Sequence, residues 1–480
     1  MTISALNTDF YELTMMQGYF LAQHNPGVVF DMFYRTNPFN GGYAVFTGLN
    51  DFLEKLEQLS FDQEDLAYLA SLKKFDPAFL EFLKGYRFSG TIYAMDEGTT
   101  VFPGEPLVRV HTTLIDAQLI ETFLLNTLNF QTLIATKAAR MSLAAKGGVI
   151  MEFGFRRAQG LDGALSASRA SFVGGTQSTS NTYAGMKYGI PVAGTMAHSW
   201  VMSFPSELES FREFAKLYPE NAILLIDTYD TLGSGIENAI IVGKELQAKN
   251  LPFGVRIDSG DLNYLSREIR QRLDDAGLNN ARIVVSNDIT EEIVQTLIHD
   301  NVPINSWGIG THLVTGGTQS SLNGVYKLSS KQNPSGDYIP TLKVSNSYEK
   351  TTLPGIKQVW RFSNETEGAL ADLITLEEEV PSIGNEYTFF HPLTEMDYFV
   401  MKAKNYTKVT PLLSCKMKDG KRILPVPTLH ELQDFARQSL NGFHGSYKRL
   451  INPHIYKVSL SRRLKDLKTE LILQTKKAEA

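Results

Sequence analysis

The sequence predicts an α/β protein whose central region forms a parallel sheet, either a closed or nearly closed barrel or a doubly wound open sheet. Short apolar runs alternate with helical patterns in this region, at intervals close to the ~30 residues of one strand–helix–strand unit. Several runs are continuously apolar, as in Ile223–Ile226, which is typical of strands buried on both faces. The presence of six such runs favours a closed or nearly closed barrel over the open sheet.

The predicted elements divide the chain into three regions. The expected strands are Val149–Phe153, Pro191–Gly194, Ala222–Asp227, Gly254–Asp258, Arg282–Ser286 and Ser306–Gly310. The expected helices between them are Ser206–Leu217, Gly235–Lys249, Asn263–Ala276 and Thr290–Asp300. Because the alternation is confined to the middle, we predict an N-terminal α/β region over 1–140, a barrel over 141–325 and a C-terminal region over 326–480. A tail from Ser459, rich in lysine and leucine, predicts a final amphipathic helix.

Composition narrows the classes of protein. A chain of 480 residues is too long for one hydrophobic core, so two or three domains are expected. The net charge of −6 argues against nucleic-acid binding, which favours a strongly basic face. The single cysteine, Cys415, allows neither an intrachain disulfide nor a cysteine metal cluster and fits a cytoplasmic location. Residues 1–10 lack a signal-peptide pattern, and the apolar stretch 114–139 carries charges, so no membrane segment is expected.

Polar residues and glycines follow successive predicted strands, at the point where each strand ends. They lie at Asp227–Asp230, Asp258–Asp261, Ser286–Asp288 and Gly308–His312. Such residues can be helix caps and turns. Four successive ends of this kind, with Arg256 just before one of them, favour a polar site at the carboxyl edge of the sheet. Carboxylates beside an arginine and a glycine-rich loop suit a sugar phosphate held with Mg²⁺.

Three further segments carry candidate site residues. Arg156, just past a predicted strand, suits a carboxylate or phosphate, although a surface ion-pair cluster is an equal alternative. The hydroxyl-rich segment 171–181, which includes Thr176, can present donors to an anion or form a plain loop. His198, followed by Ser199, can act as acid, base or nucleophile, although a lone histidine is more often structural.

Several familiar signatures are missing from the sequence. It has no G-x-x-x-x-G-K-[ST] loop, so ATP is not expected to be held by a P-loop. It has no H-E-x-x-H or Cys-x-x-Cys pattern for zinc, and no G-x-S-x-G nucleophile elbow.

These segments, in this order, resemble the nicotinate phosphoribosyltransferase family. The matching stretches are Asn7–Met15, Glu152–Phe204, Arg256–Asp261, Gly308–Thr311 and Asn452–Ser461, so the resemblance spans nearly the whole chain. It implies a type II phosphoribosyltransferase fold, which is an irregular α/β barrel with a sandwich domain built from both chain ends and, here, a C-terminal extension. It also implies a homodimer with no nucleic-acid or membrane partner, whose site is completed across the interface.

The resemblance further implies a reaction. Nicotinate and phosphoribosyl pyrophosphate would give nicotinate mononucleotide and pyrophosphate, with Mg²⁺ as cofactor and coupled hydrolysis of ATP. By this resemblance His198 is the histidine that ATP phosphorylates. Arg256 is the residue that contacts the phosphoribosyl or nicotinate groups.

The remaining site residues follow from the same resemblance. Phe153, together with Tyr11 of the partner subunit, would hold the pyridine ring between two aromatic side chains. Arg156 would bind an anion. The positions that would line the ribose phosphate are Asp258, Asp288, Gly308 and Gly310. Further substrate-binding positions within these motifs are Thr176, Ser199 and Thr311.

Three other interpretations stay open. The chain could be a nicotinamide or quinolinate phosphoribosyltransferase, which shares the barrel. It could be a non-catalytic ligand-binding homologue, although both His198 and Arg256 are present. From pattern alone, it could be an unrelated barrel enzyme that acts on another sugar phosphate.

Overall fold

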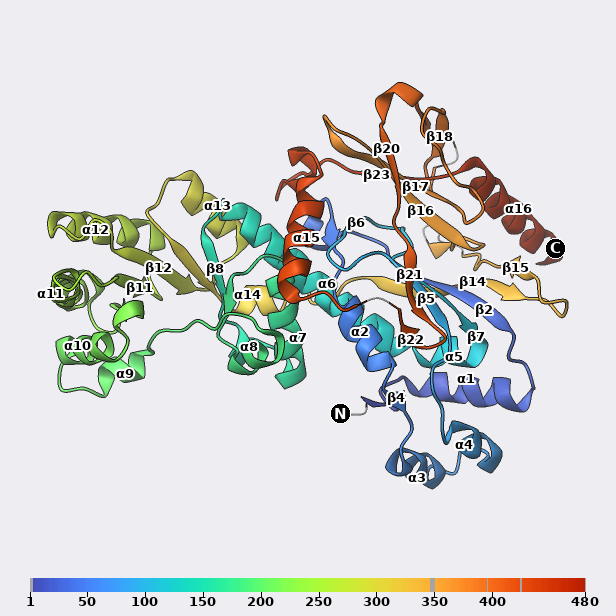
Figure 1. Cartoon of the computed structure of the whole chain (residues 1–480), viewed down its shortest axis with the longest axis horizontal. Helices are drawn as coiled ribbons and strands as arrows, with labels where there is room; N and C mark the ends of the chain where they lie inside the picture. The colour runs from blue at the N-terminus through green and yellow to red at the C-terminus, as the bar shows by residue number, and fades with distance from the viewer. Residues whose placement is uncertain (1–2, 346–349, 395, 424, 480) are drawn as a thin grey trace. The chain divides into compact units, whose positions relative to one another are not determined.

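The computed structural model describes residues 3–345, 350–394, 396–423 and 425–479. The chain divides into two compact units, which are described separately (Figure 1). Unit 1 comprises 1–133 and 321–480, and unit 2 comprises 134–320. No helix in the described part of the chain has an apolar stretch long enough to span a bilayer.

Unit 2 is built on one parallel sheet. In spatial order its strands are β10 (Ile223–Leu225), β11 (Gly254–Ile257), β12 (Arg282–Asn287), β13 (Ser306–Ile309), β8 (Val149–Glu152) and β9 (Ser178–Thr179). Every neighbouring pair is parallel. Among the described residues the two edge strands are not paired with each other. The predicted α/β class is therefore confirmed, and the ladder of the six described strands does not close.

Helices connect these strands. They are α7 (Gly160–Val173), α8 (Thr182–Tyr188), α9 (His198–Met202), α10 (Glu207–Leu217), α11 (Ile236–Gln247), α12 (Leu262–Asp275), α13 (Glu291–His299) and α14 (Thr311–Val314). Helix α6 (Glu121–Ala144) begins in unit 1 and ends in unit 2. The four helices predicted between strands are all present, with ends that differ by a few residues.

One predicted strand of unit 2 is wrong. Pro191–Gly194 forms only an isolated bridge, from Val192 to Thr179, and no strand. The short strand β9 lies instead in the segment predicted as a loop. Because Pro191 has no N–H to donate to a ladder, this short apolar run forms only a minimal extension of the sheet.

The core of unit 2 follows the continuous apolar pattern of its strands. Leu224, Val255, Val285, Trp307 and Ile309 are all fully buried. Trp307 has the largest fully buried side chain of those described. A sheet covered by helices buries both faces of each strand, so only the strand ends can carry polar groups that reach a ligand.

Unit 1 contains two larger sheets. The seven-stranded sheet has the order β15 (Tyr338–Pro340), β14 (Gly324–Gln332), β2 (Gly27–Tyr34), β7 (Val108–Thr113), β5 (Thr91–Ala94), β21 (Ser414–Lys418) and β22 (Lys421–Arg422). The six-stranded sheet has the order β19 (Tyr398–Met401), β18 (Tyr387–Phe390), β23 (Lys457–Leu460), β17 (Gly368–Leu376), β16 (Lys357–Asn364) and β20 (Lys408–Pro411).

N-terminal strands form the middle of the larger sheet, and strands from the C-terminal part of the chain flank them on both sides. The N-terminal strand β2 pairs with β14, and β5 pairs with β21, so blue and orange strands lie side by side in Figure 1. This confirms the predicted sandwich domain built from both chain ends.

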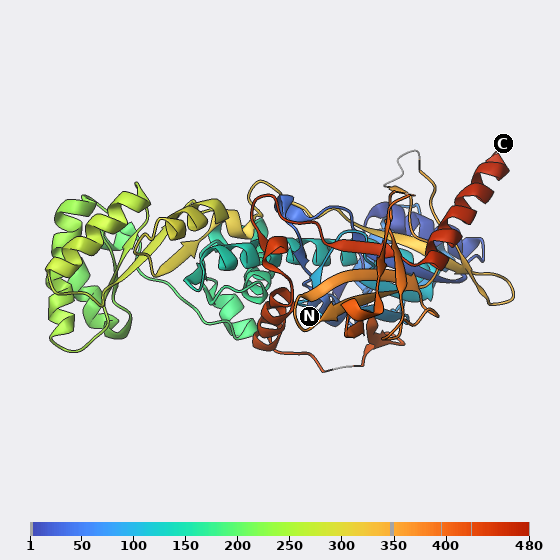
Figure 2. The ribbon, with the colours of Figure 1, turned by 90° about the horizontal axis from the view of Figure 1, so that it is seen from above.

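Smaller elements complete unit 1. They are β1 (Ile3–Ser4), α1 (Phe10–Leu21), β3 (Ala44–Val45), α2 (Leu49–Leu56), β4 (Leu59–Ser60), α3 (Gln63–Ser71), α4 (Pro77–Leu83), β6 (Thr100–Val101), α5 (Leu114–Leu119), α15 (Leu429–Asn441) and α16 (Arg462–Glu479). Helix α16 is the helix predicted for the tail, and its far end projects from the sheet beside it (red, Figure 2).

Candidate active site

The carboxyl ends of the unit 2 strands bring the predicted site residues to one edge of the sheet. Arg256 in β11 lies beside Leu225 of β10, and Ser286 of β12 lies beside Gly308 of β13. Ile309 in turn lies beside Glu152 of β8. Because these parallel strands end together, the residues that follow them surround one region of space.

His198 begins the short helix α9 and contacts two of these strand ends. Its Nδ1 lies 3.1 Å from the hydroxyl of Thr228, which follows β10. Its Nε2 lies 3.8 Å from a carboxylate oxygen of Asp258, which follows β11. The imidazole is 41% exposed, so a ligand can reach it. One ring nitrogen is thus engaged by Thr228, and the other faces Asp258 and solvent.

Two carboxylates lie on neighbouring strand ends. The Oδ2 of Asp227 accepts hydrogen bonds from the backbone N–H of Asp258 (2.9 Å) and from the hydroxyl of Ser259 (2.6 Å). The hydroxyl of Ser286 donates to Asp258. The second oxygen of Asp227 is buried, without a hydrogen-bond partner in the described part of the chain. A buried oxygen with unused capacity is a place where a ligand or ion can bind.

Arg256 lies half-buried in the same cluster. Its guanidinium donates to the hydroxyl of Thr195, and its Nε is buried without a hydrogen-bond partner among the residues described. Burial lowers the pKa of this guanidinium; Asp258 and Asp227 oppose that shift, and Arg156 adds to it. Arg156 is therefore close enough to act on Arg256, and the pair forms a cationic region suited to an anion.

The ring of Phe153 covers the glycine-rich end of β13. A Cβ added at Gly308 would lie 2.6 Å from the Phe153 ring, and one at Gly310 would lie 3.2 Å from the Phe153 carbonyl oxygen. Both positions therefore favour glycine because the chain and the ring approach each other closely. Phe153 is partly exposed, so a ligand can reach part of this aromatic side chain.

The other predicted site residues have different surroundings. Asp288 is exposed, and its backbone N–H donates to the side chain of Asn287, whose φ of 141° is unusual for a residue other than glycine. Ser199 is exposed, Thr311 begins α14, and Thr176 is buried, with 1% of its surface exposed.

Tyr11, the remaining predicted site residue, belongs to unit 1, where it lies in α1 and is 49% exposed.

A cleft of about 440 Å³ in unit 2 adjoins Asp288 and is bounded by the loops that precede α12 and α13. Within this cleft Asp261 caps α12 by accepting from the N–H groups of Asn263 and Tyr264, so that residue serves the helix.

Family models for nicotinate phosphoribosyltransferase match three parts of the chain. The N-terminal domain model matches residues 6–129, the central family model 149–333 and the C-terminal domain model 356–468. The chain belongs to the nicotinate phosphoribosyltransferase family.

Relatives agree with this family over nearly their whole length. The nicotinate phosphoribosyltransferase of Bacillus subtilis (strain 168) is 38% identical over 459 residues, which cover 95% of this chain and 93% of that protein. The human nicotinate phosphoribosyltransferase is 35% identical over 526 residues, covering 97% and 96%.

Solved structures show the same fold. The crystal structure of human nicotinic acid phosphoribosyltransferase superposes with a TM-score of 0.85 at 33% identity, covering 97% of this chain and 99% of that one. A nicotinate-nucleotide pyrophosphorylase from Pyrococcus furiosus matches with a TM-score of 0.67 at 21% identity, covering 92% and 95%, and supports the fold alone.

Some site residues of this nicotinate phosphoribosyltransferase family member were missed by sequence reasoning. Asp227, Thr228 and Ser286 were singled out only as members of polar strand ends, and Thr195 was given no individual role. Their contacts cross between segments that lie far apart in the sequence. The only sequence feature that pointed to these residues was the presence of hydroxyl groups near His198 and after β10. Hydroxyl side chains are too common for that feature to identify site residues.

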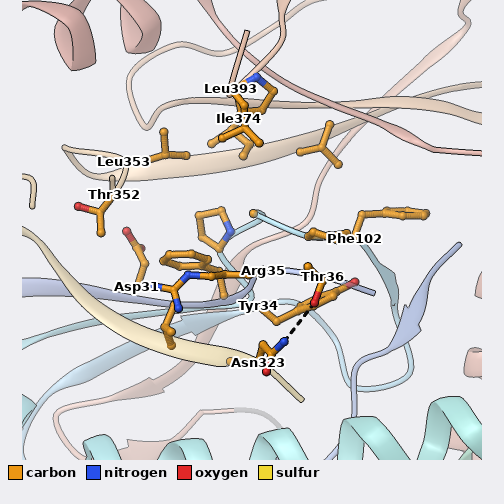
Figure 3. Close-up of a pocket in the computed structure, with 18 of the residues that line it drawn as sticks. Asp31, Tyr34, Arg35, Thr36, Phe102, Asn323, Thr352, Leu353, Ile374 and Leu393 are labelled. Atoms are coloured by element: carbon orange, nitrogen blue, oxygen red, sulfur yellow. Dashed lines mark hydrogen bonds between the residues drawn. The ribbon is translucent and has the colours of Figure 1, made fainter. Parts of the chain in front are cut away.

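Another cavity of this family member lies in unit 1, between its two sheets. It has a volume of about 760 Å³, and Figure 3 shows Asp31, Arg35, Leu353 and Ile374 among its walls. Asp31 forms a 2.7 Å ion pair with the buried Lys357. None of the residues predicted for the site lines this cavity. The predicted chemistry therefore gathers at the strand ends of unit 2 rather than in this cavity.

Proposed function

We propose that this chain transfers the phosphoribosyl group of phosphoribosyl pyrophosphate to nicotinate, giving nicotinate mononucleotide and pyrophosphate for NAD salvage, with coupled hydrolysis of ATP. The observation that carries the proposal is the convergence of His198, Arg256 and Asp258 at adjoining strand ends in a chain of this family. The single cysteine is consistent with action in the cytoplasm.

The transfer step follows from the chemistry of the site. The pyridine nitrogen forms a bond to carbon 1 of the ribose while the bond from that carbon to pyrophosphate breaks, and its electron pair leaves with pyrophosphate. Stacking on Phe153 positions the ring, and Arg156 can pair with its carboxylate. The half-buried Arg256 stabilises negative charge on the leaving group, because a preorganised cation in a poorly solvated site acts strongly.

Mg²⁺ would act in this site together with substrate phosphates. Asp227 and Asp258 offer two carboxylates, and one oxygen of Asp227 has no hydrogen-bond partner in the described structure. The described residues contain no group of three or more metal-ligating side chains, so the donor set fits an ion shared with substrate phosphates. When bound, Mg²⁺ neutralises charge on the pyrophosphate.

ATP coupling would proceed through His198. A ring nitrogen attacks the terminal phosphorus of ATP, a P–N bond forms, and ADP leaves with the electron pair of the broken P–O bond. Water later cleaves the P–N bond and releases phosphate. Thr228 holds Nδ1, so the ring keeps one orientation while this occurs. The phosphohistidine adds negative charge near Arg256 and thereby changes how tightly phosphoribosyl pyrophosphate is held.

A homodimer would complete the site. Unit 2 exposes apolar side chains on α7, on α8 and at the following bridge residue, namely Leu161, Tyr183, Met186 and Val192. Exposed apolar groups of this kind are common where a second chain binds. In this arrangement Tyr11 of the partner subunit would cover the pyridine ring opposite Phe153.

The reaction is tested by measuring nicotinate mononucleotide formation from nicotinate, phosphoribosyl pyrophosphate and Mg²⁺, with and without ATP. We expect product that rises with ATP, together with ADP. Nicotinamide and quinolinate serve as alternative acceptors in the same assay. Product from one of these acceptors, and not from nicotinate, would identify that acceptor as the substrate. No product from any acceptor would favour a ligand-binding homologue.

The role of His198 is tested by His198→Asn. We expect this variant to lose ATP stimulation and ADP release while retaining slow synthesis without ATP. His299→Asn is a matched control, because His299 ends α13 and is 87% exposed. Normal ATP stimulation in His198→Asn would exclude His198 as the phosphorylated residue.

A further inference from the structure

The carboxylate of Glu152 is buried, and this residue directly precedes Phe153, on which nicotinate is predicted to stack. Glu152 is the last residue of β8 and has no exposed surface. One carboxylate oxygen accepts from the backbone N–H of Gly154. The other accepts from the hydroxyls of Ser168, at 2.9 Å, and Thr179. Removing a carboxylate from water costs several kcal/mol unless donors replace the water, and three donors do so here.

These hydrogen bonds join four segments of unit 2. The side-chain amide of Asn181, which caps α8, donates to the Ser168 hydroxyl at 3.2 Å. The backbone N–H of Asn181 donates to the Thr179 hydroxyl at 2.9 Å, and that of Ser180 donates to the Glu152 carbonyl oxygen at 2.8 Å. The hydrogen-bond network around the Glu152 side chain thus connects the end of β8, helix α7, strand β9 and the start of α8. A satisfied buried polar network of this kind fixes one arrangement of its segments.

Phe153 lies between the two backbone positions that this network holds. On one side is Glu152 itself, and on the other is Gly154, whose N–H is bound by the Glu152 carboxylate. The N–H of Phe153 donates to the carbonyl oxygen of Ile309 at 2.8 Å. Gly154 is itself tightly packed, since an added Cβ would lie 2.3 Å from Val314. With both neighbours fixed, the backbone at Phe153 has little freedom, and its ring is kept over Gly308.

We propose that Glu152 is a positioning residue for the acceptor, which acts through Phe153 by holding its ring in the plane on which nicotinate stacks. This rests on the proposed function, because the ring matters only if an aromatic acceptor lies against it. Glu152 has no route to the substrate of its own, since its surface is fully buried. Misplacement of a bound reactant by about 1 Å can cost about 100-fold in rate, so a residue that only aims a ring can have a large kinetic effect.

The test is Glu152→Gln, which keeps the shape of the side chain but replaces one acceptor oxygen with an amide donor. We expect the KM for nicotinate to rise by about 10- to 100-fold, while the KM for phosphoribosyl pyrophosphate changes by less than about 3-fold. The matched control is Glu207→Gln. Glu207 is also buried in unit 2 and accepts from Asn238 at 3.0 Å, but it lies in α10. We expect this control to leave both KM values unchanged.

A double-mutant cycle separates positioning from a purely structural role. If Glu152 acts through Phe153, then Glu152→Gln should change the nicotinate KM by less than about 3-fold in a Phe153→Leu background. If the changes in nicotinate KM of the two single variants multiplied in the double variant, the proposal would be overturned. A Glu152→Gln protein with a lower melting temperature but an ordinary nicotinate KM would also overturn it.

Two milder variants keep the proposal testable if Glu152→Gln does not fold. Ser168→Ala and Thr179→Val each remove one hydroxyl donor and leave the Gly154 hydrogen bond in place. Each should raise the nicotinate KM by a few-fold without changing that for phosphoribosyl pyrophosphate, and unchanged values in both would overturn the proposal. The failure of the proposed function is distinguishable, because the unmodified protein would then make no nicotinate mononucleotide.

Discussion

A buried ion pair of unit 1 and the strand-end charges of unit 2 are satisfied to different degrees. In unit 1, Arg361 forms a 2.6 Å pair with the fully buried Asp372, and the hydroxyl of Tyr456 donates to the same carboxylate at 2.9 Å. In unit 2, His198 and Asp258 remain 41% and 35% exposed, and their nearest atoms are 3.8 Å apart. Charges that satisfy one another in a core stabilise one fold, whereas charges left with unused capacity at an edge can bind a ligand.

The interior of unit 1 also contains one strongly perturbed acid. Burial, followed by the neighbouring Asp372, raises the pKa of Glu105 well above its ordinary value. The carboxyl therefore holds its proton more tightly than an ordinary glutamate does. A perturbed pKa in this protein is thus not by itself a mark of the active site.

Breaking the paired charge of unit 1 should give the largest effect. Arg361→Met leaves Asp372 buried without its cation, which we expect to lower the free energy of unfolding by about 3 to 5 kcal/mol. Denaturant titration measures the loss, and activity per folded molecule at low temperature should be retained. Arg437→Met is the control, because Arg437 pairs with Asp434 on the surface. An equal decrease in the free energy of unfolding of the two variants would contradict the expected difference between buried and surface ion pairs.

Removing the Arg256 guanidinium should cost a similar free energy, but the loss should appear in kcat/KM rather than in stability. We expect Arg256→Met to reduce kcat/KM by about 100- to 1,000-fold, since Arg256 faces developing charge on the leaving group. The melting temperature should change little, because Arg256 has an unused donor and only a partial set of partners. Arg212→Met, which removes an exposed pair with Glu245, is the control. A large loss of stability with an unchanged kcat/KM would show that Arg256 has a structural role and not a catalytic one.

A smaller effect is expected where the ring and the glycine-rich end approach each other. Gly308→Ala places a methyl group 2.6 Å from the Phe153 ring, so the ring must shift. We expect the KM for nicotinate to rise by about 10-fold, on the scale of such misplacement. Gly163→Ala is the control, since no atom lies within 4 Å of its added Cβ. An unchanged KM in Gly308→Ala would show that the ring position does not govern binding.

The smallest effect is a pH dependence in unit 1. Burial raises the pKa of Glu12 from an ordinary value of 4.5 to about 6. The folded protein therefore binds this proton more tightly, and the associated stability is complete below pH 4.5 and lost as pH rises through 6. Glu12→Gln should be more stable than the unmodified protein at pH 8, by on the order of 1 kcal/mol, and not at pH 4.

Denaturant titrations at several pH values measure this difference. Glu54→Gln, at an exposed position of α2, should show no such trend. If Glu12→Gln changed stability equally at every pH, the buried carboxyl would not be the cause.

The sequence predicted where the polar strand ends lie but not their local contacts. Phe153 was named only through the family resemblance, whereas strand ends, with His198 and Arg256 beside them, were identified from local patterns of apolar and polar residues. The contact between His198 and Thr228, and the role of Asp227 as acceptor for the Asp258 loop, were not. Those contacts depend on β10 lying beside β11 and on the path of the chain before α9, neither of which a local pattern records.

The sequence by itself determined the α/β class, the alternation of unit 2 and the end of the chain that is helical, because these follow from apolar periodicity within short windows. Only the tertiary structure decided that β8 lies between β13 and β9, and that β14 and β21 pair with strands from the other end of the chain. Strand order is set by which long-range pairings bury the most apolar surface, and that competition involves the whole unit at once. For the same reason Glu152 reads as an ordinary acid at the end of a strand until Ser168 and Thr179 are brought to it.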